Sequence, residues 1–237
     1  MDLVYPRRCP ICDRIIIEDM IHQPCKDSIT MVEEPVCFSC GKPLLSEEVE
    51  LCRDCIEHPK HFWKGYAVFL YNDQTRPSMM AYKYANRREY TEFYISMMIK
   101  KYGLQWMKEQ YDGIVPVPVH WKRRAKRGYN QAELLASALG KVLQVPVYSK
   151  LIVRTVNTLP LKQLSNIERL KHLTRAFQPG YTYIRKHPQD CKRLKKVLLV
   201  DDIYTTGATM DACTVVLQNI GIEEVHVASV CIGQGYS

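Results

Sequence analysis

The chain of 237 residues lacks any apolar run long enough to cross a bilayer. Its first residues, MDLVYPRRCPIC, also lack the apolar stretch of a secretory signal peptide, and no segment is of low complexity. These absences exclude a membrane-spanning protein and predict a soluble cytoplasmic one. The composition is 46% hydrophobic, which is enough for one substantial core and a small additional module.

Cysteine, in contrast, is abundant: the chain has ten, and seven of them lie in the first 55 residues. In a reducing cytoplasm, paired Cys-x-x-Cys units indicate metal binding rather than disulfides. Two such pairs, Cys37 with Cys40 and Cys52 with Cys55, are separated by eleven residues and offer four thiolates to one tetrahedral Zn²⁺. Gly41 permits the tight turn after the first pair. We therefore predict a structural zinc site here.

A second, degenerate copy of this pattern lies upstream. Cys9 and Cys12 form a pair, Cys25 follows after twelve residues, and Ser28 stands where a fourth cysteine would fall. A neutral serine is a poor zinc ligand, so either His22 or another group is the fourth ligand, or the metal is held weakly, or it has been lost. His22 is equally well explained as an ordinary surface residue.

Charge is divided unevenly along the chain. Residues 1–59 contain six Lys and Arg against twelve Asp and Glu, a net −6, whereas the remainder has 27 against 13, a net +14. Any electrostatic binding of nucleic acid should therefore use the C-terminal part. Residues 82–88 interleave cations with tyrosines, which suits stacking on single-stranded bases; alternatively, the tyrosines pack on the core. Residues 192–196 are predicted to be a solvated approach to a strand. The nucleic-acid candidates are Tyr82, Lys83, Arg87, Arg88 and Arg124.

The most informative segment runs from residue 197 to residue 209. Residues 197–200 form an unbroken apolar run typical of a buried parallel strand, and Asp201 and Asp202 follow where ligands of open α/β sheets bind. Adjacent carboxylates can accept hydrogen bonds from a vicinal diol. The next residues can converge on a phosphate at the positive end of a helix: Thr205, Thr206, Gly207, Ala208 and Thr209, the last being the predicted N-cap. The apolar strand and the TTGAT sequence argue against the alternative, a solvated turn.

Other segments predict the rest of a doubly wound sheet. Residues 112–119 indicate a strand and a proline-stiffened loop, the basic run 122–127 follows, and residues 132–143 have the pattern of an amphipathic helix. This order brings the cations near Asp201 and Asp202, where a pyrophosphate group would need positive charge. Further strands are expected at residues 61–71 and 224–232, and an amphipathic helix with a core-facing methionine and aromatic stripe at residues 89–102.

These motifs resemble two known patterns. VDDIYTTGAT resembles the phosphoribosyl pyrophosphate (PRPP) loop of type I phosphoribosyltransferases, which implies that Asp201 and Asp202 bind the ribose hydroxyls and that residues 205–209 hold the 5′-phosphate. The cysteine ribbon, PVP with its basic run, RGYNQ, the stretch from Arg154 and VDDIYTTGAT occur in one order over essentially the whole chain, which resembles the ComF family, named for DNA uptake in natural competence. The chain departs from the family at Ser28 and at His172, where asparagine is common.

The resemblance also implies a pyrophosphate loop after Val115 and a flap over residues 154–177 that closes on the ligand, which would be PRPP accompanied by Mg²⁺. The candidates in these two segments are His120, Lys122, Arg123, Arg127, Gln163 and Arg169.

We therefore expect an α/β fold in two parts. Residues 60–237 should form a doubly wound parallel sheet like that of type I phosphoribosyltransferases, and residues 1–59 a small zinc-ribbon module with a degenerate copy at 9–28 and a complete copy at 37–55. Two functions remain open. One is a PRPP-binding protein that handles single-stranded DNA with the DNA-uptake machinery; the other is a conventional phosphoribosyltransferase that moves 5-phosphoribose to a base or other nucleophile and releases pyrophosphate. The sequence has no recognisable base-binding hood or acceptor acid/base residue, so enzyme activity is left undecided.

Overall fold

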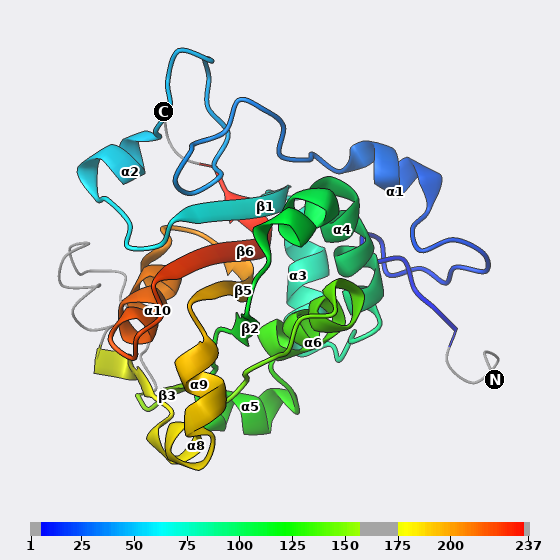
Figure 1. Ribbon diagram of the computed structural model, residues 1–237. Helices are drawn as coiled ribbons and strands as arrows, with labels where there is room; N and C mark the ends of the chain where they lie inside the picture. The colour runs from blue at the N-terminus through cyan, green and yellow to red at the C-terminus, as the bar shows by residue number, and fades with distance from the viewer. Residues whose placement is uncertain (1–5, 157–174, 235–237) are drawn as a thin grey trace.

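The computed structural model describes residues 6–156 and 175–234. At its centre is a fully parallel sheet in the order β1-β6-β5-β2, with β1 at Lys64–Tyr71, β6 at Glu224–Gly233, β5 at Lys196–Tyr204 and β2 at Gly113–Pro116 (Figure 1). All four strands were predicted from apolar runs. β2 leads into the proline-containing loop, as predicted, and Val117 just beyond it still donates its N–H to the Val200 carbonyl at 2.8 Å. β5 is longer than predicted, because its pairing with β6 continues to Tyr204.

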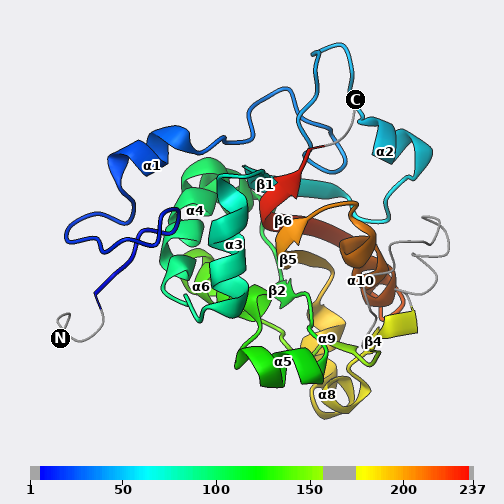
Figure 2. The ribbon, with the colours of Figure 1, turned by 180° about the vertical axis from the view of Figure 1, so that it is seen from behind.

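Helices cover both faces of the sheet. α3 (Thr75–Tyr84), α4 (Tyr90–Glu109) and α6 (Gln131–Leu143) pack on one face, and α10 (Ala208–Gln218) packs on the other (Figures 1 and 2). Along β5, Leu198 and Val200 belong to the apolar cluster of the first face, whereas Val197 and Leu199 belong to that of the second. This alternation explains the unbroken apolar run, since a strand covered on both faces buries every side chain. The predicted doubly wound α/β class is confirmed.

The remaining elements are short. They are α1 (Gln23–Ser28), α2 (Arg53–Glu57), α5 (Trp121–Arg127), α8 (Tyr181–Lys186), α9 (Pro188–Arg193) and an antiparallel pair, β3 (Ile152–Arg154) with β4 (Phe177–Pro179), which lies against α10. In the described ranges, no helix combines the length and apolar character needed to cross a membrane.

The cysteine-rich segment covers the edge strand β1. Val32 donates its backbone N–H to Val68 at 2.8 Å, and Leu70 donates to Thr30 at 3.0 Å, so the segment satisfies backbone groups that an open edge would expose. The four thiols of the complete cysteine copy belong to the same apolar cluster as α10 and one face of β5. The sequence predicts a domain boundary near residue 59. In the structure, one apolar core includes residues from both sides of that position.

Candidate functional site

Asp201 and Asp202 lie where β5 extends beyond the end of its neighbour β2. Pairing with β2 ends at Val200 opposite Pro116, while pairing with β6 continues to Tyr204. Asp201 and Asp202 are therefore part of β5 rather than residues beyond it, but they stand at the carboxyl edge that the sequence predicted. Asp202 is buried and Asp201 half-buried, and the Asp202 backbone N–H donates to the Asp201 carboxylate at 2.8 Å.

A lysine that the sequence assigned to nucleic acid completes this pair. Lys83, near the end of α3, places its Nζ 2.8 Å from Asp202 Oδ2. Burial and the charge of Asp202 raise the pKa of Asp201 to about 8. Burial disfavours the charge on Lys83, but attraction to Asp202 and Asp201 outweighs it and raises the pKa of the lysine. The lysine therefore compensates negative charge at the carboxylate pair.

The RGYNQ motif holds the end of α3 in place. The Tyr129 hydroxyl donates to the Tyr82 carbonyl, and Gln131 Nε2 donates to the Lys83 carbonyl at 3.3 Å. Arg127 donates to the Tyr84 hydroxyl at 2.9 Å and to Gln131 Oε1 at 3.2 Å. Arg127, a predicted pyrophosphate residue, is thus engaged in the scaffold that positions Lys83.

The phosphate loop follows β5 and opens α10. Gly207 has φ +76°, and a Cβ at this position would lie 2.1 Å from the Tyr204 hydroxyl oxygen, so the loop requires glycine here. The N-cap is Gly207, which corrects the prediction of Thr209. Thr205 and Thr206 are exposed, and Ala208 and Thr209 are half-buried in the first turn. Their hydroxyls and the free N–H groups of that turn suit an anion.

Cations from two further segments approach the carboxylates. Lys122 is exposed and Arg123 half-buried on α5, which His120 caps by accepting a hydrogen bond from the Lys122 N–H at 3.3 Å. Burial, and then the charge of Arg123, lower the pKa of Arg154 at the end of β3, while Asp201 opposes this effect. Arg154 therefore interacts electrostatically with both Arg123 and Asp201. Gln163 and Arg169 lie outside the described residues, as does most of the predicted flap.

The structure corrects two nucleic-acid candidates. Tyr82 is completely buried and has no ring face for a base, which favours the alternative that it packs on the core. Arg87 holds Asp13 of the first ribbon copy, with N–O distances of 2.7 and 2.8 Å. Arg88 lies over the Tyr129 ring at 4.5 Å, and Arg124, exposed on α5, pairs with Glu133 at 3.1 Å. Arg88 and Arg124 stay candidates.

Two exposed aromatic rings lie beside cations but are not among the nucleic-acid residues predicted from the sequence. Trp121 is 66% exposed with Lys122 over its ring, and Tyr84 is 59% exposed with Arg127 over its ring. Both rings lie in basic segments of the sequence, but periodicity could not tell which aromatic side chains of those segments face solvent. They offer the open faces that stacking on bases requires.

The complete cysteine copy forms a compact four-thiol cluster. The sulfur atoms of Cys37, Cys40, Cys52 and Cys55 all lie within 4.8 Å of one another, and the sulfurs of Cys40 and Cys52 are 3.6 Å apart. Thiolates about 2.3 Å from a tetrahedral zinc lie about 3.8 Å apart, so the cluster fits this metal. Gly41 adopts φ +77° in the turn, as predicted.

The degenerate copy brings His22, not Ser28, to its three thiols. Ligand atoms of Cys9, Cys12, His22 and Cys25 lie within 4.8 Å of one another, with His22 Nδ1 3.2 Å from Cys12 Sγ. The exposed Ser28 donates instead to the Cys25 carbonyl. Of the alternatives that the sequence left open, the structure favours His22 as the fourth ligand.

Comparisons with known proteins agree with this architecture. Residues 1–56 match the double zinc ribbon domain and residues 125–235 the phosphoribosyl transferase domain. Similar proteins include competence protein F of Haemophilus influenzae (27% identical, covering 81% of this chain and 82% of the relative) and competence protein ComFC of Streptococcus pneumoniae (29%, covering 86% and 84%). Over most of its length the chain is similar to these competence proteins. DNA utilization protein YhgH of Escherichia coli is another similar protein, 26% identical over 85% of this chain and 86% of its own. The match to the double zinc ribbon and the thiol clusters support structural zinc as the cofactor of this ribbon.

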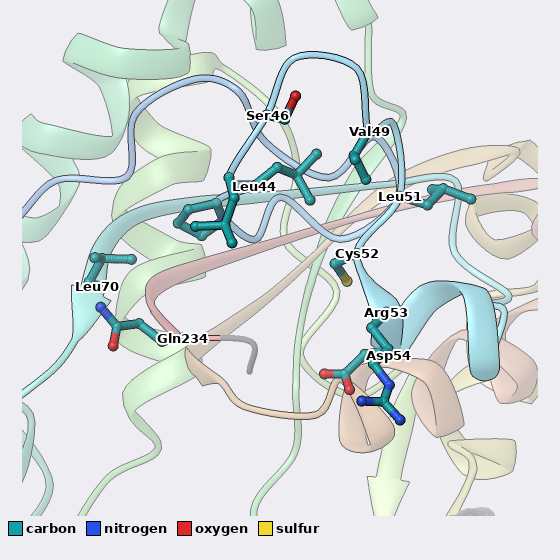
Figure 3. Close-up of a pocket in the computed structure, with 11 residues that line it drawn as sticks. Leu44, Ser46, Val49, Leu51, Cys52, Arg53, Asp54, Leu70 and Gln234 are labelled. Carbon is teal, nitrogen blue, oxygen red and sulfur yellow. The ribbon is translucent and has the colours of Figure 1, made fainter. Parts of the chain in front are cut away.

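The ribbon also forms one wall of a pocket at the ends of β1 and β6. A cavity of about 410 Å³ lies between ribbon residues 43–54, Leu70 near the end of β1, and Gln234 just after β6 (Figure 3). The neighbouring Gly233 packs on the phosphate loop, since a Cβ there would lie 3.7 Å from Thr205 Cα. The walls are mostly aliphatic, with a few polar groups, as in small-molecule sites. The polar residues that line the pocket are Ser46, Arg53, Asp54 and Gln234.

Proposed function

We propose that this protein binds PRPP with Mg²⁺ at the carboxyl edge of β5 and acts in the handling of single-stranded DNA during natural competence. The observation that carries the proposal is the Asp201–Asp202 pair at the carboxyl edge of β5, with Lys83 2.8 Å from Asp202, followed directly by the loop that requires Gly207; the charge of Asp201 also acts on Arg154. The names of the relatives, competence protein and DNA utilization protein, support the DNA-handling role.

Each part of PRPP has a partner of suitable chemistry. The carboxylates accept hydrogen bonds from the ribose diol, and the α10 N-terminus with Thr205 and Thr206 takes the 5′-phosphate. Arg123 and Arg154 attract the diphosphate. Mg²⁺, bound through phosphate oxygens, reduces the charge of that group. Lys83 keeps Asp202 oriented and neutralised until the ligand enters.

Exchanging both carboxylates for amides tests the PRPP site. In Asp201→Asn with Asp202→Asn, we expect PRPP affinity to fall by about tenfold or more, because a charge-assisted hydrogen bond of about 1.5–3 kcal/mol to Asp202 and a weaker one to Asp201 are lost. Titration calorimetry with PRPP and Mg²⁺ measures this, and circular dichroism checks the fold. Asp201→Asn alone leaves the Lys83–Asp202 pair intact. Asp73→Asn is the control, since that side chain is 93% exposed in another loop. Native PRPP affinity in the double variant would contradict the assignment of Asp201 and Asp202 to the PRPP site.

Exposed cations of α5 test the DNA role. We expect Lys122→Glu with Arg124→Glu to weaken binding of single-stranded DNA about tenfold or more, and to flatten its dependence on salt, because each phosphate contact contributes to counterion release. Trp121→Ala should weaken binding further through lost stacking. Lys192→Glu with Arg193→Glu is the matched control, because it changes charge equally at exposed positions of α9. Equal weakening by both pairs, measured by fluorescence anisotropy, would contradict a DNA surface at α5.

The second candidate is transfer of phosphoribose to an acceptor, which the pocket lined by Gln234 favours, because the preceding Gly233 packs on Thr205. Pyrophosphate leaving C1 of ribose would develop charge that Arg123, Arg154 and Mg²⁺ can stabilise. Incubation with PRPP and Mg²⁺, with and without single-stranded DNA, separates the candidates. Release of pyrophosphate supports transfer, and binding without release supports a handling or sensing role.

A further inference from the structure

Ser229, within strand β6, has a buried hydroxyl that the fold does not use. The residue is 2% exposed, and its Oγ has no hydrogen-bond partner among the described residues. A buried hydroxyl without a partner costs free energy, because it gives up its hydrogen bonds to water and gains none in return. Alanine would fill nearly the same space without that cost. The hydroxyl therefore calls for an explanation outside the stability of the sheet.

The register of the sheet places Ser229 beside the first carboxylate of the site. Ser229 pairs with Asp201 of β5 on one side and with Ala67 of β1 on the other. Neighbouring strands lie about 4.8 Å apart, and residues paired across parallel strands point to the same face. Val197 and Leu199 belong to the apolar cluster of the α10 face, so the alternate residue Asp201 shares that face with Ser229. Of the two register partners of Ser229, only Asp201 has a polar side chain.

The two carboxylates of the site therefore face opposite sides of the sheet and need separate support. On the α3 face, Lys83 Nζ lies 2.8 Å from Asp202 Oδ2. On the α10 face, burial and the charge of Asp202 raise the pKa of Asp201 to about 8, which disfavours its ionised form at neutral pH. The charged and titratable groups that face Asp201 come from its own strand, α3, β3 and α10: Asp202, Lys83, Arg154 and Cys213.

We propose that Ser229 is a positioning residue of the PRPP site, whose hydroxyl donates a hydrogen bond to ionised Asp201. This inference rests on the proposed PRPP site, in which the carboxylate accepts hydrogen bonds from the ribose diol. Rotation about the Cα–Cβ bond of Ser229 turns Oγ toward the neighbouring strand. An O–H donor stabilises a carboxylate much more than a neutral carboxyl group, so it favours ionisation. Ser229 thus supports Asp201 on one face of the sheet as Lys83 supports Asp202 on the other.

Ser229→Ala tests this role, because it removes the hydroxyl and adds no bulk. We expect the pKa of Asp201 in the variant to stay at about 8, and in the native protein to lie lower. On the acidic side of this value, PRPP should bind the variant about tenfold more weakly, the usual effect of one lost hydrogen bond to a charged group. On the alkaline side the two affinities should converge, since Asp201 is ionised in both proteins. Titration calorimetry with PRPP and Mg²⁺ over a pH series measures this, and the ligand's own titration cancels in the comparison.

Ser78→Ala is the matched control. Ser78 is 3% exposed, but its hydroxyl is hydrogen-bonded to the Tyr94 hydroxyl at 2.6 Å. Its replacement should lower the melting temperature by a few degrees and leave the pH dependence of PRPP affinity native. For Ser229→Ala the melting temperature at acidic pH, where Asp201 is protonated, should not fall, because the unpaired hydroxyl adds nothing to the fold.

The outcomes are distinguishable. Native affinity at every pH in Ser229→Ala would overturn the inference while leaving the PRPP site intact. Equal weakening at every pH, or a melting temperature that falls as in Ser78→Ala, would also overturn it, because the residue would then act through packing. Failure of the native protein to bind PRPP would refute the proposed function and this inference with it. Weakening confined to the acidic side of about pH 8, at a native melting temperature, supports the inference.

Discussion

Gly207→Ala is expected to reduce PRPP affinity by about a hundredfold or more. The new Cβ would lie 2.1 Å from the Tyr204 hydroxyl oxygen and 2.5 Å from Cζ of the same ring. The loop must therefore move away from the Tyr204 side chain. The displaced N–H groups then no longer point at the 5′-phosphate, and two lost charge-assisted hydrogen bonds account for the fall. Calorimetry with PRPP and Mg²⁺ measures it directly.

Gly221→Ala provides a matched control for this prediction. Gly221 also adopts a left-handed backbone, with φ +97°, but an added Cβ meets nothing within 4 Å. Its replacement should therefore destabilise the protein by about 1–2 kcal/mol without changing PRPP affinity. If Gly207→Ala behaved like Gly221→Ala in both measurements, the loop would not be the phosphate site.

Loss of the second zinc centre should damage the fold far more than loss of the first. We expect Cys52→Ser and His22→Ala each to lower the zinc content by about one per chain. Cys52 lies in the core shared with α10 and β5, and removal of its zinc should lower the melting temperature by roughly 10 °C or more, since each kcal/mol corresponds to about 2–4 °C for a chain of this size. Structural zinc in isolated peptides contributes up to about 10–16 kcal/mol, so complete unfolding is within range.

The first centre is attached more loosely. It contacts the main body through Asp13, which accepts hydrogen bonds from Arg87 and from the Tyr90 hydroxyl. His22→Ala should therefore lower the melting temperature by only a few degrees. Metal analysis and calorimetric melting check both variants. Native zinc content in His22→Ala would remove His22 as a ligand, and equal melting temperatures would contradict a shared core at Cys52.

The carboxylate pair and its loop could be predicted because their chemistry is local. The strand, the carboxylates, the glycine turn and the helix start follow one another within 13 residues, so one short stretch of sequence contains every part of the predicted site. Lys83 could not be assigned in this way. Its segment has an ordinary mixture of cations and tyrosines, and only the packing of α3 against the RGYNQ motif shows that Tyr82 turns inward while Lys83 reaches Asp202.

By itself, the sequence determined the parallel α/β sheet and the four-thiol zinc set, and it predicted a sugar-phosphate site at residues 201–209, because each is encoded by short-range periodicity or spacing. The tertiary structure decided which donor joins the first cluster, which cation faces the carboxylates, and what supports the phosphate loop. Lys83 faces a carboxylate in a distant segment, and the fold of the ribbon brings His22 to three thiols whose spacing does not single it out. Such contacts depend on how the ribbon and α3 pack against the sheet, and spacing within one segment does not specify that packing.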